Sequence, residues 1–203
     1  MTLTNFTELT ERLYGLFAHA DFRGMKGFAN EVPIFIQTYP IAQEDALRQM
    51  VGGLNARLTQ AGLQVCVLDL FGLVLEELEE NGVLDALVQD EPEFDKQELL
   101  ETLQNYSDPR TYLIKRLVER ISSSGAQMAL ITGAGRVFPF LRTHTVLESL
   151  QPQMPQLPVV FFFPGEYEQG LDGGSHLRLF GSIPSPTINN PYYRAINLDH
   201  FRL

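Results

Sequence analysis

Cysteines and long apolar runs are scarce in this sequence. Its 203 residues include one cysteine, Cys66, so no disulfide can form within the chain, and a reducing compartment is expected. No run approaches the roughly 18 to 20 apolar residues that a membrane helix needs. The first residues are charged and amphipathic, which is not typical of a signal peptide. These features favour a cytoplasmic protein that is not inserted in a membrane.

The composition is that of one globular domain. Hydrophobic residues make up 44% of the chain and charged residues 20%, both ordinary for a folded protein. We therefore expect a single domain over residues 1–203 that needs neither a metal nor a disulfide to fold.

Acidic charge is concentrated in the first half of the chain. Residues 1–109 hold 19 acidic and 6 basic side chains, whereas residues 110–203 hold 6 and 9. The net charge of −10 would repel a phosphate backbone, so no direct nucleic-acid partner is expected. An acidic helical segment at about 73–105 is either a solvated surface or a docking surface.

Apolar periodicity predicts helices that alternate with buried strands. Helical spacing covers 3–18, 43–60, 73–88 with a break at Asn81-Gly82, 97–103, a helix starting at Asp108-Pro109, and 137–150 with an early break at Pro139. Short apolar runs at 32–36, 65–70, 128–131 and 159–163 predict strands, with 65–70 buried on both faces. Residues 177–180 and 193–198 suit edge strands. The pattern predicts a three-layer α/β fold with a mostly parallel or mixed sheet, Rossmann-like or P-loop-like but without a Walker motif.

Complete catalytic and cofactor motifs are missing. The 132–135 turn follows a strand, where phosphate loops sit, but no lysine occurs after residue 115 and Phe138 replaces the third glycine of a dinucleotide fingerprint. The four histidines lack the spacing of a helical metal pair, and Cys66 lies within a predicted strand. We therefore expect no cofactor, no metal and no enzymatic activity.

Polar residues nevertheless follow several predicted strands. The carboxyl ends of strands in an open α/β sheet meet in one crevice. A shared crevice is therefore predicted for five residues, Asp69, Thr132, Gly133, Arg136 and Glu166. The competing interpretation is that these side chains cap helices or pair with one another.

Several stretches in the second half of the chain together resemble a known family. The stretches are 131–147, 150–152, 158–167, 177–181, Asn190 and 192–195. Their order resembles the BrxB-like components of BREX bacteriophage-defence systems, densely over 128–198 and more loosely before that.

The resemblance implies a role within a multi-protein assembly that pairs methylation of host DNA with a block on phage replication. It implies a non-enzymatic accessory or scaffold subunit whose partners include the phosphatase-like PglZ, the ATPase BrxC, or both. Tyrosine and arginine are enriched in interface hot spots, so the candidate contact residues are Tyr167, Tyr192, Tyr193 and Arg194.

Two alternatives from other classes stay open. One is a small-molecule or nucleotide-phosphate site near the 132–136 loop. The other is a nucleic-acid module built on basic residues of the second half, namely Arg110, Lys115, Arg116, Arg120, Arg136 and Arg142.

Overall fold

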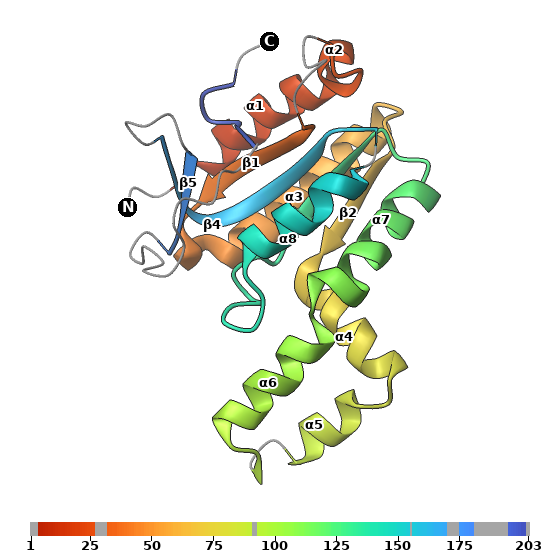
Figure 1. The fold of residues 1–203 in the computed structure, drawn as a ribbon. Coiled ribbons are helices and arrows are strands. Elements are labelled where there is room, and N and C mark those ends of the chain that lie inside the picture. The colour runs from red at the N-terminus through yellow and green to blue at the C-terminus, as the bar shows by residue number, and fades with distance from the viewer. Residues whose placement is uncertain are drawn as a thin grey trace.

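A mixed, mostly parallel sheet forms the centre of the protein (Figure 1). The computed structural model describes residues 4–26, 32–90, 93–154, 156–169, 175–180 and 195–201. Within them the strand order is β2-β3-β4-β1-β6, and β5 pairs antiparallel with β4. The strands are β1 (Ile34–Tyr39), β2 (Val65–Asp69), β3 (Met128–Thr132), β4 (Val159–Gln169), β5 (Ser175–Leu179) and β6 (Ile196–Asn197).

Helices cover both faces of this sheet, which confirms the predicted three-layer α/β class (Figure 1). The helices are α1 (Phe6–Ala18), α2 (Ala20–Arg23), α3 (Glu44–Gln60), α4 (Leu70–Glu80), α5 (Leu84–Asp90), α6 (Lys96–Tyr106), α7 (Ile114–Ser123) and α8 (Thr143–Leu150). Short 3-10 turns span Ile41–Gln43 and Gln151–Gln153, and a π-helical turn spans Pro109–Leu113.

The two cores follow from the alternation of side chains along each strand. Successive residues of a strand point to opposite faces, so Phe161 packs with α4, α7 and α8 while Phe162 packs with α1 and α3. Helix α3 buries Leu47, Leu54 and Leu58 along one stripe against the second core, as their spacing predicts. Both cores share the sheet. The prediction of one domain over 1–203 stays a prediction.

The expectation that residues 65–70 are buried on both faces is wrong. Strand β2 lies at the end of the sheet order, with β3 as its neighbour. Cys66 is buried, whereas the Val67 side chain is 37% exposed. An apolar run alone does not tell an edge strand from a central one, because both carry the same local propensity.

Pro164 acts differently from the prediction, whereas Pro139 breaks the helix as expected. Strand β4 does not end at Pro164 but continues to Gln169, and beyond Pro164 it pairs with β5 instead of β1. The helix expected over 137–150 begins at Thr143. Turns occupy the segment around Pro139, which offers no amide hydrogen to a helix.

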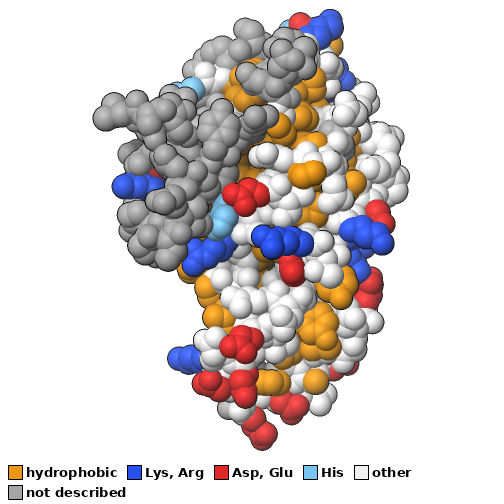
Figure 2. All heavy atoms as spheres, in the orientation of Figure 1, with side chains coloured by type: hydrophobic (Ala, Val, Ile, Leu, Met, Phe, Trp, Pro, Cys, Tyr) orange, Lys and Arg blue, Asp and Glu red, His pale blue; other side chains and the backbone are white. Residues whose placement is uncertain are grey.

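The acidic segment predicted at 73–105 forms most of α4, all of α5 and most of α6. In Figure 1, α5 and α6 project from the sheet beyond α4, and Figure 2 shows acidic side chains gathered over that end of the molecule. Leu87 of α5 is buried, while Val88 beside it is 68% exposed.

Candidate functional site

Four of the five predicted crevice residues lie together at the carboxyl ends of β2 and β3. Asp69 and Thr132 are the last residues of these strands and face each other in register. The Arg136 guanidinium, on the loop after β3, forms an ion pair with the Asp69 carboxylate. The Thr132 hydroxyl is buried and donates to the Leu68 carbonyl at 3.4 Å. The interpretation that these side chains pair with one another or cap helices therefore describes the observed geometry.

Gly133 allows the loop after β3 to approach Asp69. Its φ of 81° lies in the left-handed region that favours glycine. A methyl group at this position would overlap the Asp69 carboxylate and lie 3.2 Å from the Phe71 backbone nitrogen. Asp69 accepts a hydrogen bond from that same nitrogen at 3.3 Å, and so caps α4.

A second carboxylate extends this pairing to β1. The Arg136 Nε lies 4.0 Å from Glu44 Oε1, at the start of α3, and the Tyr39 hydroxyl donates a hydrogen bond to Glu44. Burial raises the pKa of the Tyr39 hydroxyl far above its ordinary value of 10.0, and the Glu44 carboxylate raises it further. The hydroxyl therefore stays protonated and keeps donating. We call Tyr39, Glu44, Arg136 and Asp69 the polar chain.

The polar chain places two carboxylates beside Arg136 on the loop after β3, the position at which nucleotide-binding folds carry a phosphate loop. Gly135 also packs closely there, since a methyl group on it would lie 2.9 Å from Ile41 and 3.0 Å from Pro164. An anion at this loop would compete with the Asp69 carboxylate for the Arg136 guanidinium. The loop thus ties β1, β2 and β3 together.

Tyr39→Phe tests the polar chain directly. Loss of the hydroxyl leaves the Glu44 carboxylate without its donor, so we expect a loss of about 1–2 kcal/mol in the free energy of unfolding. Urea denaturation followed by circular dichroism measures it. Tyr112→Phe is the matched control, because that side chain is exposed, and its change should stay within about 0.5 kcal/mol. Equal effects at both positions would contradict this role for Tyr39.

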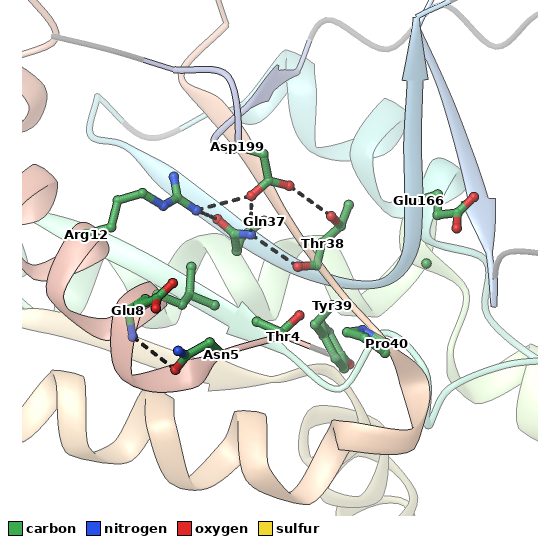
Figure 3. A pocket seen from close by; sticks show the side chains of 12 residues that line it. Thr4, Asn5, Glu8, Arg12, Gln37, Thr38, Tyr39, Pro40, Glu166 and Asp199 are labelled. Carbon is green, nitrogen blue, oxygen red and sulfur yellow. Dashed lines mark hydrogen bonds and ion pairs between the residues drawn. The ribbon is translucent and has the colours of Figure 1, made fainter. Parts of the chain in front are cut away.

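Glu166, the fifth predicted residue, lines a different cavity. It lies on β4 beyond Pro164, half-buried, beside a pocket of about 450 Å³ between α1, the end of β1 and Asp199. Figure 3 shows Glu8 and Glu166 on opposite sides of this pocket, with a cluster of linked polar groups between them.

Sequence reasoning missed that cluster, which joins Arg12, Gln37, Thr38 and Asp199 (Figure 3). Arg12 donates to the Leu198 carbonyl at 2.6 Å and to Gln37 Oε1 at 2.7 Å, and pairs with Asp199 at 3.1 Å. Gln37 Nε2 donates to Asp199 at 2.8 Å, and the Thr38 hydroxyl donates at 3.0 Å. The available signal was a glutamine-threonine pair at the end of an apolar strand, 25 residues from Arg12.

Of the four predicted contact residues, the structure describes Tyr167. Tyr167 is half-buried, and its hydroxyl donates to the Ala195 carbonyl at 2.8 Å, which ties β4 to the segment before β6. Tyr192, Tyr193 and Arg194 lie outside the described residues.

The two arginines of α7 are engaged by carboxylates of α4. Arg116 lies 2.9 Å from Glu77 and also pairs with Glu80, while Arg120 lies 2.8 Å from Glu76. These contacts neutralise much of the face that a nucleic-acid module would use.

The described part of the chain contains no group of three or more histidine, cysteine or acidic residues placed to hold a metal ion. Cys66 is buried, and burial raises the pKa of its thiol, which disfavours the nucleophilic thiolate. Among the same residues, no helix has the length and apolar character to cross a membrane.

Together, the sheet, its two helical layers and the polar chain define a three-layer α/β protein with an internally paired loop after β3. The chain belongs to the family of the BREX protein BrxB, whose model matches residues 66–198.

Two curated relatives carry that description. A BREX protein BrxB from Bacillus cereus (strain H3081.97) is 28% identical over 200 residues, which covers 97% of this chain and 98% of the relative. A BREX protein BrxB from Escherichia coli O9:H4 (strain HS) is 25% identical over 172 residues, which covers 85% and 80%. No solved structure matches the chain.

Proposed function

We propose that this chain is a non-enzymatic subunit of a BREX phage-defence assembly and that it works by docking other proteins of that system. Membership of the BrxB family and the names of both relatives support the BREX component. The phosphatase-like PglZ and the ATPase BrxC are the partners to test first.

The observation that carries the non-enzymatic part is the engagement of Arg136 by Asp69 and Glu44. The groups most suited to bind a phosphate or a small anion are committed to holding three strands together. A subunit with this arrangement would act by binding other proteins and not by catalysing a reaction.

The projecting α5 and α6 support the docking part. Acidic side chains gather over these helices (Figure 2), and Val88 is exposed among them. An exposed apolar side chain within a charged rim is a common feature of interaction surfaces. The acidic charge would favour a basic partner surface.

Co-purification is the deciding experiment. The tagged chain is expressed with the products of its neighbouring genes and recovered at low and moderate salt. We expect stable recovery of a phosphatase-like protein, an ATPase, or both. The first variants are Tyr192→Ala and Arg194→Ala, with Tyr112→Ala as an exposed control. Recovery of the chain alone at both salt concentrations would refute the stable-subunit proposal.

One observation favours a second function, the binding of a small phosphate ligand near the 132–136 loop. The buried Nε of Arg136 has no hydrogen-bond partner among the described residues, so this N–H is available to donate to a phosphate oxygen. A ligand that binds the folded state raises its melting temperature. A rise with inorganic phosphate or ATP that is lost in Arg136→Met would support this function, and an unchanged melting temperature would reject it.

A further inference from the structure

We infer that the pocket between Glu8 and Glu166 binds a basic side chain, an arginine or a lysine, that a partner protein inserts into it. The inference rests on the proposed docking function and names the site and the chemistry of one contact.

Open α/β sheets bind ligands beyond the carboxyl ends of their strands. The pocket lies at the end of β1, and its volume of about 450 Å³ is within the range of roughly 300–1,000 Å³ typical of binding sites.

The charges on its walls select a cation. The charged residues of the lining are Glu8, Arg12, Glu166 and Asp199. Arg12 is already committed to Asp199, Gln37 and the Leu198 carbonyl. Among the residues that the structure describes, nothing donates to the carboxylate of Glu8 or of Glu166. After the Arg12–Asp199 ion pair is counted, the lining keeps the carboxylates of Glu8, which is exposed, and of Glu166, which is half-buried.

The floor of the pocket is held rigid before any ligand arrives. Gln37 is 2% exposed and joins Arg12 to Asp199. Burying a polar side chain is costly unless it is hydrogen-bonded, and here its bonds fix the Asp199 carboxylate, which also accepts from Thr38. A site with fixed acceptors loses less free energy on binding than a mobile one.

A guanidinium or ammonium group fits these acceptors better than a metal ion does. The carboxylates come from α1, β4 and the segment after β6, and the described residues hold no cluster with metal-ligand geometry. Arginine offers five donors and lysine three, which suits acceptors distributed around a pocket. The net charge of −10 would also steer a basic surface toward the chain.

The test measures binding of the recovered partner to Glu8→Gln/Glu166→Gln by biolayer interferometry at low salt. We expect affinity to fall about tenfold or more, because both unpaired carboxylates that face the bound cation are lost. The matched control is Glu79→Gln/Glu148→Gln, which changes the net charge equally at exposed positions of α4 and α8 and should change affinity less than about twofold. Unchanged melting curves would show that both double variants fold.

The outcomes separate this inference from the function on which it rests. If the wild-type chain binds no BREX protein, the docking function fails. If it binds and both double variants bind equally well, the function stands and the pocket inference fails. Agmatine, a free guanidinium compound, distinguishes the source of the cation. Stabilisation of the isolated chain by micromolar agmatine, absent from Glu8→Gln/Glu166→Gln, would assign the pocket to a small ligand and overturn the partner side chain.

Discussion

Gly133→Ala is expected to lower the free energy of unfolding by about 3 kcal/mol or more. Alanine in the left-handed region costs about 1–2 kcal/mol. At Gly133 the new methyl group would also overlap the Asp69 carboxylate and press on the Phe71 backbone nitrogen. The carboxylate cannot move away without breaking both its cap on α4 and its ion pair with Arg136. Urea denaturation measures the change.

Gly82→Ala is the matched control for this experiment. Gly82 follows Asn81, the C-cap of α4, with a φ of 70°, but no atom lies within 4 Å of the position of an added methyl group. It should show the conformational cost alone, about 1 kcal/mol. In an Asp69→Ala background, Gly133→Ala should cost less than in the wild type because the overlapping carboxylate is gone. Equal costs at Gly133 and Gly82 would mean that Asp69 does not pack against the loop.

Arg116→Met is the second substitution that we expect to lower the free energy of unfolding strongly. The change keeps the aliphatic stem but removes the charge, which leaves Glu77 without its cation. The Arg116 side chain is 17% exposed and that of Glu77 is 10% exposed. Removing one member of a fully buried pair costs about 3–5 kcal/mol. Because Glu76 and Glu80 are more exposed, we expect Arg116→Met to lower the free energy of unfolding by about 2 kcal/mol.

Lys115→Met is the control on the same helix. Its ammonium group lies 4.0 Å from Glu119, and both side chains are well exposed, so the change should stay below about 0.5 kcal/mol. The double variant Arg116→Met/Glu77→Leu should recover much of the lost stability, because no unpaired charge remains. A double variant less stable than Arg116→Met would contradict this account.

The pairing of Arg116 also predicts how its effect depends on pH. The Arg116 guanidinium, hydrogen-bonded to Glu80, lowers the pKa of that carboxyl below its ordinary 4.5, although partial desolvation opposes the shift. A carboxyl with a lowered pKa in the folded state stabilises that state above its unfolded pKa, and this stabilisation is lost as the pH falls through the folded pKa. The difference in free energy of unfolding between the wild type and Arg116→Met should therefore become smaller as the pH falls from about 6 to about 3. Urea midpoints at both pH values test this.

The sequence predicted part of the candidate site. The rule that parallel strands end at one edge placed Asp69 near Thr132 and Arg136, and the structure brings these residues together. The rule did not place Glu166 correctly, because β4 runs past Pro164 to pair with β5 and carries that carboxylate to another cavity. The Arg12–Asp199 pair spans 187 residues of chain, and no local spacing signals such a contact.

Local sequence determined the elements of this protein, and tertiary packing determined their neighbours. The apolar run at 159–163 is a strand because β-branched and aromatic side chains pack well on a pleated, buried surface. The stripe on α3 specifies a helix with one buried face. Only the assembled sheet decided that β2 is an edge and that β1 lies between β4 and β6. Strand order depends on which connections can cover each face of the sheet, and that competition involves the whole chain.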